Sequence, residues 1–230
     1  MEYSVYKENN MSFSSYLIKC FMWMFFGLLV SFGVAAFFSY SGLLLTILVN
    51  FGTAFILISS IVEIVLVISL SRSVMKINTS KATVLFFIYS IINGITLSSI
   101  FYLYDLTSII YVFLAAAAVF GIMALVGYTT KLDLSKLGTF ILVALLSLAL
   151  VGIVLMFAFN EVAYLIYSFI GVGLFMIITT YDIHIIKRIY YETNSNEQKN
   201  ALSIYGALQL YLDFINIFIH LLSLFGRSRD

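Results

Sequence analysis

The sequence predicts an all-α membrane protein, a polytopic bundle of seven transmembrane helices with the C-terminal helix at its centre. Of the 230 residues, 63% are hydrophobic and only 10% are charged, and the mean hydropathy is +1.09. Soluble domains of this size carry more charge, whereas chains that cross a bilayer several times have this composition. Seven apolar runs are each long enough to span the hydrocarbon core as a helix.

Each predicted helix coincides with an apolar run of about 20 residues or more. The predicted spans are Tyr16–Ser39, Leu43–Leu70, Ala82–Tyr104, Ser108–Tyr128, Leu137–Phe159, Val162–Ile186 and Ala201–Phe225. Proline is absent from the sequence, so a break within a span would arise from glycine, serine or local unwinding. Short connections favour antiparallel packing of sequential helices. We therefore expect a cytoplasmic N-terminal arm over residues 1–15 and one transmembrane domain over residues 16–230.

The spans differ in their polar residues. The first has no small-residue cleavage site, which indicates a retained helix rather than a signal peptide. The second contains Glu63, with Ser59 one turn before it, and the third contains Asn93 beside Gly94. The sixth and seventh each carry one acid within the apolar run, namely Asp182 and Asp213.

The distribution of Lys and Arg predicts the orientation. Ten of the twelve fall on one side of the seven spans: Lys7, Lys19, Arg72, Lys76, Lys81, Lys131, Lys136, Lys187, Arg188 and Lys199. Only Arg227 and Arg229, after the last span, fall on the other side. Basic connections stay in the cytoplasm, so we expect a multi-pass protein of the cell membrane with a cytoplasmic N-terminus. A last segment that enters the membrane and returns would instead place all twelve inside.

The same counts limit the partners. The net charge is +1 and the basic residues are scattered, which does not favour a nucleic-acid surface. Cys20 is the single cysteine, so neither an intrachain disulfide nor a cysteine metal cluster is expected. The lipid bilayer is the partner that the composition implies, and no cofactor is expected.

The two acids of the last spans are the main functional signal. An acid at the centre of a transmembrane helix costs about 2.5–3.5 kcal/mol on insertion scales, and a sequence keeps one where it has a partner or a function. If Asp182 and Asp213 meet, they are expected to share a proton, because two close carboxyls do not both ionise easily. An alternative is that Asp182 is a boundary acid paired with Lys187 and Arg188, although offsets of five and six residues suit such pairs poorly.

The last predicted helix carries a polar stripe. Gln209, Asp213, Asn216 and His220 are offset by 4, 7 and 11 residues, which places them on one helical face over roughly 16 Å. Lipid would penalise this face, so it should point into the bundle or towards water, which predicts a central helix lining a pathway. Alternatively, the stripe supplies interhelical hydrogen bonds worth about 0.6 kcal/mol each on average.

The depths of the two acids differ when they are counted from the ends of the apolar runs. A meeting of Asp182 and Asp213 would require the start of the last helix to project into the cytoplasm, which the polar residues Asn200 and Ser203 permit. Glu63 is interpreted either as a carboxylate of a cation pathway or proton relay, or as a neutral acid bonded to a hydroxyl such as that of Ser59. Asn93 and Gly94 predict close helix packing, with an amide that bonds across the contact.

The last block, Leu210-Tyr211-Leu212-Asp213-Phe214-Ile215-Asn216, resembles a signature of the transmembrane Bax-inhibitor-motif family, in its bacterial branch. The segments Tyr181-Asp182-Ile183-His184 and Asn93-Gly94-Ile95-Thr96-Leu97-Ser98 and the position of Glu63 are similar to the family as well. The resemblance implies a C-terminal helix wrapped by two layers of three helices. It also implies a pH-sensitive calcium leak with two facing aspartates, at Asp182 and Asp213. A basic latch for one aspartate is implied at Arg72, with Lys76 as an alternative.

The leading hypothesis is therefore a calcium-leak channel that is gated by a proton shared between Asp182 and Asp213. Glu63 adds a further acid to the pathway and pH sensor, and Gln209, Asn216 and His220 line it. Calcium, the permeant ion, would contact the two aspartates, since it prefers carboxylate and carbonyl oxygens. Two alternatives are a non-conducting regulator that binds other membrane proteins and a proton-coupled transporter. An enzyme is not expected, because a HExxH motif is missing and no Ser–His pairing stands out.

Overall fold

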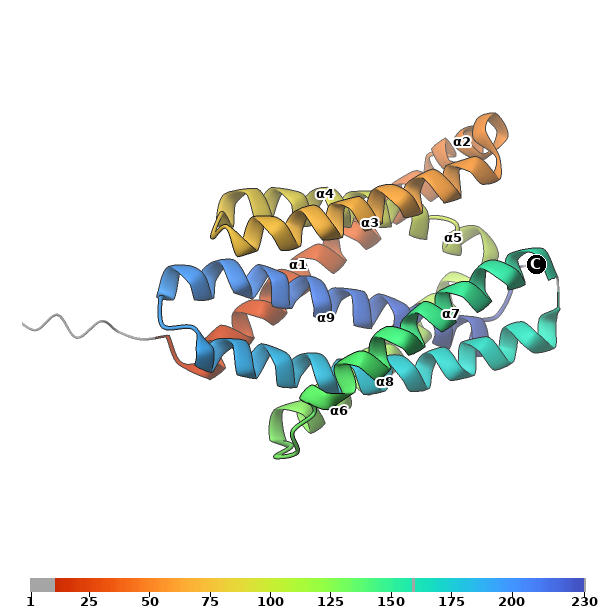
Figure 1. Ribbon diagram of the computed structural model, residues 1–230. Helices are drawn as coiled ribbons and strands as arrows, with labels where there is room; N and C mark the ends of the chain where they lie inside the picture. The colour runs from red at the N-terminus through yellow and green to blue at the C-terminus, as the bar shows by residue number, and fades with distance from the viewer. Residues whose placement is uncertain (1–10, 159, 230) are drawn as a thin grey trace, which may run out of the picture.

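The named secondary-structure elements are all helices in the part of the chain that the computed structural model describes, residues 11–158 and 160–229 (Figure 1). Most of the predicted N-terminal arm, with Lys7, lies outside the described residues, as do Phe159 and Asp230. The helices are α1 (Phe13–Tyr40), α2 (Leu43–Phe51), α3 (Thr53–Met75), α4 (Thr79–Leu97), α5 (Ile100–Leu103), α6 (Leu106–Thr129), the 3₁₀ helix η1 (Ser135–Leu137), α7 (Gly138–Ala158), α8 (Glu161–Glu192) and α9 (Asn196–Phe225). The all-α prediction is confirmed.

Seven helical segments of the described chain are long and apolar enough to cross a membrane, as predicted. The second predicted span, Leu43–Leu70, is wrong as a single helix. The chain breaks at Gly52, where φ is +56°, so that α2 ends and α3 begins there. Glycine adopts this conformation at little cost because it has no Cβ, and hydropathy alone does not reveal such a break. The third span is also divided, since α4 ends at Leu97 and the short α5 follows.

The last two helices are longer than their apolar runs. Helix α8 continues to Glu192 and α9 begins at Asn196, so the connection between them is only Thr193–Ser195. The first turns of α9 therefore lie outside its apolar run, as the meeting of the two aspartates requires. The polar ends are helical because charged and amide residues are compatible with an α-helix in water. Hydropathy predicts only the part of a helix that lies in the hydrocarbon, so it did not predict these ends.

Helix α9 is the centre of the bundle (Figure 1). It packs against α1, α3 and α4 on one side and against α6 and α8 on the other, while α7 packs on α8. In the most apolar window of α9, 61% of the residues are buried, compared with 6% for α7. The structure thus confirms the predicted central C-terminal helix, enclosed by two groups of three long helices.

The two ends of α9 lie at opposite ends of the bundle. At its start, the side-chain amide oxygen of Asn196 accepts a hydrogen bond from the Met11 backbone (3.3 Å), and that of Asn200 accepts one from Lys19 (2.7 Å). After its end, the Arg227 carbonyl accepts a hydrogen bond from the Asp105 backbone (3.0 Å). One continuous helix joins these ends, so the alternative of a segment that enters and returns is wrong.

Candidate functional site: buried acids around the central helix

The structure brings Asp182 and Asp213 together across the interface of α8 and α9. Their exposed fractions are only 7% and 2%. Asp213 interacts electrostatically with Asp182 and is hydrogen-bonded to the side chain of Thr179, one turn before Asp182 on α8. The Thr179 hydroxyl also lies 2.8 Å from the carbonyl oxygen of Phe175. Helices α8 and α9 thus enclose two acids and a hydroxyl at the core of the bundle.

Some oxygen atoms of this interface have no hydrogen-bond partner. Among the described residues, the buried side-chain atoms without one are Asp213 Oδ2, Gln209 Oε1 and Ser168 Oγ, all of which lie on α8 or α9. Leaving a buried polar group unpaired costs about 1–3 kcal/mol. Gln209 and Asp213 are one turn apart on α9, so their unpaired oxygens place acceptors for a cation or a water molecule along this helix.

The polar stripe of α9 faces two different surroundings. His220 is buried against α8, where its ring lies 5.2 Å from that of Tyr167 and 5.9 Å from that of Phe175. Gly171 makes room for it, because a Cβ at that position would overlap the imidazole. Asn216 is half-buried, and its amide donates to the Leu212 carbonyl of its own helix (2.8 Å). The stripe therefore does not line a single channel in this structure.

Glu63 lies on the other side of α9. It lines a pocket of about 430 Å³ between α3, α4 and α9, which Asn216 also lines. Thr96 of α4 donates to Glu63 Oε1 (3.0 Å), and the Asn93 side chain is hydrogen-bonded to Glu63 as well. The hydroxyl bonded to Glu63 is thus that of Thr96 and not that of Ser59, which sequence offsets had suggested.

Asn93 and Gly94 have the packing role that the sequence indicated. A Cβ on Gly94 would lie 2.6 Å from the backbone oxygen of Ser31, so only glycine permits this approach of α4 to α1. Beside it, Asn93 bonds across the helix contact, because its amide oxygen lies 2.8 Å from the hydroxyl of Tyr211 on α9.

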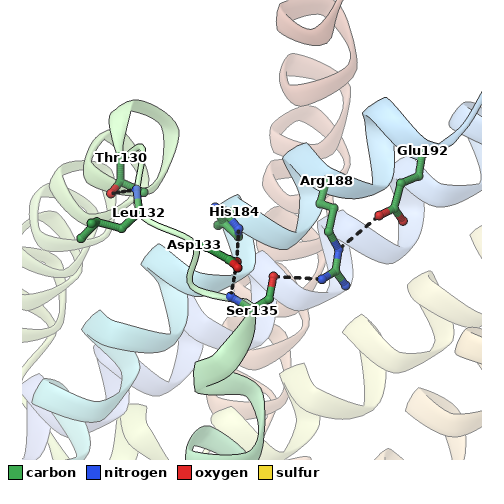
Figure 2. Close-up of polar contacts among 7 residues, drawn as sticks. All are labelled: Thr130, Leu132, Asp133, Ser135, His184, Arg188 and Glu192. Carbon is green, nitrogen blue, oxygen red and sulfur yellow. Dashed lines mark hydrogen bonds and ion pairs between the residues drawn. The ribbon is translucent and has the colours of Figure 1, made fainter.

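The basic residues near Asp182 are engaged elsewhere. Lys187 donates to the Tyr128 carbonyl. Figure 2 shows that Arg188 bonds Ser135 (3.0 Å) and pairs with Glu192 (3.6 Å). His184 Nε2 lies 3.9 Å from Asp133 Oδ1 in the α6–α7 connection. These contacts do not support the interpretation of Asp182 as an acid paired with Lys187 and Arg188.

The basic residues considered as a latch lie at the surface. Arg72 and Lys76, at the end of α3, are both exposed. Within residues 11–158 and 160–229, the ion pairs are those of His184 with Asp133 and of Arg188 with Glu192, so neither Arg72 nor Lys76 is joined to an acid here.

Sequence reasoning missed three residues of this region. Thr179 and Tyr211 lie in apolar runs, where a hydroxyl group gives no signal until its partner on another helix is known. Lys199 appeared to belong to a connection, but it is on α9, only 6% exposed, with its ammonium group 4.3 Å from the centre of the Tyr190 ring. A cation over an aromatic face is favourable, which explains how this lysine is accommodated.

The acids do not form a dedicated metal site. No group of three or more His, Cys, Asp or Glu side chains is suitably placed to hold a metal ion in the described part of the chain. Calcium takes six to eight oxygen ligands in stable protein sites. Asp182 and Asp213 with Thr179 provide too few for stable binding, although they offer oxygens to an ion that passes.

Comparisons with known proteins agree with this architecture. The family model described as "Inhibitor of apoptosis-promoting Bax1" (Bax1-I) matches residues 13–230. The chain is 37% identical over 217 residues to the inner membrane protein YbhL of Escherichia coli K12, covering 94% of this chain and 92% of that protein. It is 34% identical to an uncharacterized membrane protein of Streptococcus pyogenes serotype M1, with 99% of each chain covered. An uncharacterized protein of Borreliella burgdorferi is 33% identical over 218 residues, with 94% of each covered. The chain is thus a multi-pass membrane protein that belongs to the Bax1-I family.

Proposed function

We propose that this protein is a calcium-leak channel whose opening depends on the protonation of Asp182 and Asp213. The observation that supports the proposal is the burial of these two interacting acids between α8 and α9, the helices joined by the short connection Thr193–Ser195. One proton shared by the pair removes the repulsion between the carboxylates and joins the two helices. Loss of that proton leaves two like charges in a buried interface, which drives the helices apart.

Thr179 suits such a switch because a hydroxyl can donate one hydrogen bond and accept others. When Asp213 is ionised, Thr179 donates to it. When Asp213 is protonated, it donates to Thr179, which then donates to the Phe175 carbonyl 2.8 Å away. Either charge state of Asp213 therefore has a partner on α8, and the change between them needs only a rotation of the Thr179 hydroxyl.

The unpaired oxygens of Gln209 and Asp213 support a path for cations next to the gate. Calcium is a hard cation that favours such carboxylate and amide oxygens. In the proposal, Asn216 and Glu63 provide further oxygens on the side of α9 that faces α3 and α4, and His220 is the last residue of the stripe, on the side that faces α8. Arg72, at the end of α3, is assigned the latch role for one aspartate in the closed state, with Lys76 as its alternative.

The proposed orientation has the N-terminus in the cytoplasm, because ten of the twelve Lys and Arg residues fall on that side of the spans predicted from the sequence. The gate then faces the cytoplasm, since Asp182 lies between mid-helix and the cytoplasmic end of α8. Calcium flux into vesicles that contain only this protein, measured over a pH series, tests the proposal. Flux that requires a second solute would indicate a transporter, and absence of flux at every pH would indicate a non-conducting regulator.

A further inference from the structure

Polar side chains form a continuous chain of contacts from α3 through α4 and α9 to α1. Glu63 contacts Asn93, whose amide oxygen lies 2.8 Å from the Tyr211 hydroxyl. The Tyr211 hydroxyl lies 2.6 Å from Ser31 Oγ, which lies 2.7 Å from the carbonyl oxygen of Ser90. Ser31, Ser90 and Tyr211 are fully buried and Asn93 is 7% exposed. Because these groups exclude bulk water, each hydrogen in the chain must be accounted for by a protein atom.

The Ser31 hydroxyl has one hydrogen but three oxygen neighbours. Gly27 O lies 3.0 Å away, in addition to Ser90 O and the Tyr211 hydroxyl. The two carbonyl oxygens can only accept. The Ser31 hydrogen therefore points to a carbonyl, and the 2.6 Å contact with Tyr211 requires the hydrogen of Tyr211.

The Asn93 amide can have only one orientation in this chain. Tyr211 donates its single hydrogen to Ser31, so it can only accept from Asn93, and the Asn93 atom that faces Tyr211 must be the NH₂ group. The two ends of an amide have the same shape, and the hydrogen-bond network decides between them. The amide oxygen of Asn93 then faces Glu63 and needs a donor, which an ionised carboxylate does not have.

From this count we infer that Glu63 holds a proton and donates it in a hydrogen bond to Asn93, at the head of a directed chain through Tyr211 and Ser31 to the Ser90 carbonyl. Thr96 lies 3.0 Å from Glu63 Oε1 and donates to it or to the carbonyl oxygen of Ile92, 3.2 Å away. The other titratable groups that interact with Glu63 are the hydroxyls of Tyr89 and Tyr211. This inference deepens the role of Glu63 in the proposed function, but it involves neither calcium nor the aspartate pair.

Loss of the proton would reverse the whole chain. An ionised Glu63 needs the NH₂ group of Asn93, so Tyr211 turns its hydrogen to the Asn93 oxygen and Ser31 turns its own to Tyr211. The Ser90 and Gly27 carbonyl oxygens then face Ser31 Oγ without a hydrogen between them, at 2.7 and 3.0 Å. The α1–α4 contact would weaken as a result. The protonation of an acid on α3 is in this way communicated through α4 and α9 to α1.

Infrared difference spectroscopy on the purified protein in lipid tests this inference, because a protonated carboxyl has a C=O stretching band that a carboxylate lacks. In an Asp182→Asn/Asp213→Asn background at neutral pH, we expect such a band, its loss in Glu63→Gln and a shift of its frequency in Tyr211→Phe. Tyr102→Phe, which removes a hydroxyl that donates to the Ser39 carbonyl and lies outside the chain, should leave the band unchanged.

A spectrum that Glu63→Gln does not alter would overturn the inference, as would a band that is insensitive to Tyr211→Phe. If the Asp182→Asn/Asp213→Asn background does not fold, the difference between the spectra of the wild type and Glu63→Gln gives the same answer.

Thermal unfolding adds an independent check. Glu63→Gln keeps a donor for Asn93 and should unfold close to the wild-type temperature, whereas Glu63→Ala should unfold lower; equal losses in the two would also contradict the inference. None of these measurements depends on calcium flux, so failure of the channel proposal would not affect them.

Discussion

Asp213 on α9 interacts with Asp182 on α8 although the two acids lie at unequal distances from the connection that joins their helices. Helix α9 begins at Asn196, outside its apolar run, so that its first turns project beyond the hydrophobic segment, as a meeting of the two acids requires. Both acids are buried, and Thr179 bonds Asp213 from the same face of α8. The properties of either acid therefore depend on the charge of the other.

Because α4 lies very close to α1 at Gly94, we expect a single methyl group added at this position to lower the stability of the protein. In Gly94→Ala, the added Cβ would lie 2.6 Å from the Ser31 backbone oxygen, which cannot move without shifting α1. We expect a loss of about 1–3 kcal/mol, as for other overpacked cores. Gly33→Ala on α1, where nothing lies within 4 Å, is the matched control and should be neutral or slightly stabilising. Thermal unfolding of both variants in detergent checks this, and equal unfolding temperatures would contradict it.

Two amides of the polar stripe should respond differently to replacement by leucine. Gln209 Oε1 is buried without a partner, so Gln209→Leu should leave stability unchanged or raise it, by up to about 1–3 kcal/mol. Asn216 bonds only a carbonyl of its own helix, so Asn216→Leu should change stability little. Both should lower calcium flux if these oxygens line the path. Unaltered flux in both variants would show that the stripe only stabilises the bundle.

The basic residues predict the orientation of the bundle in the membrane. In a Cys20→Ala background, a cysteine at position 80, in the first turn of α4, should react in intact cells only with a membrane-permeant reagent. A cysteine at position 228 lies at the opposite end, where Ser228 pairs with Tyr104, and should react with an impermeant reagent. Both Ser80 and Ser228 are exposed, so accessibility does not bias the comparison. The reverse labelling pattern would invert the topology.

Asp133 offers a control for the pH response. Hydrogen bonds from the backbone and hydroxyl of Ser135 lower the pKa of Asp133, and His184 contributes as well. Its ionised form is thus favoured in the folded protein, and this contribution is complete above the usual carboxyl pKa and is lost only as the pH falls through the lowered value. Between about pH 5 and 8, Asp133→Asn should therefore leave the midpoint of the flux curve unchanged. His184→Gln is the companion variant, because it removes the side chain that lies 3.9 Å from Asp133 Oδ1. A shifted midpoint in either would place part of the sensor in the α6–α7 connection.

The sequence was sufficient to predict the fold class and the central position of α9. Hydropathy identifies the segments that prefer lipid. A polar face on one of these segments predicts that it is surrounded by other helices, and α9 has such a face, formed by Gln209, Asp213, Asn216 and His220. Hydropathy does not report backbone breaks, so the turn at Gly52 was not predicted. It is also silent about helix outside the membrane, so the polar ends of α8 and α9 were missed.

The candidate site was predictable in its acids but not in their partners. A carboxyl in an apolar run is conspicuous by its cost, which identifies Glu63, Asp182 and Asp213. A hydroxyl in such a run is common, so Thr179 and Tyr211 could be recognised only from the helices that face them. The packing of α3 against α4 brings Thr96, and not Ser59, to Glu63, and no local sequence pattern reveals which residues of the two helices face each other.

The central claim is that Asp182 and Asp213 act as one proton-binding unit, and calcium flux in vesicles from about pH 5 to 8 tests it most directly. Asp182→Asn and Asp213→Asn should each remove most of the pH dependence, and the double variant should resemble the single ones, since the coupling is lost with the first substitution. Tyr211→Phe should keep a pH-dependent flux because it leaves both acids in place. If each single variant keeps a full pH response and only the double variant loses it, the two acids act independently and the shared-proton gate is wrong.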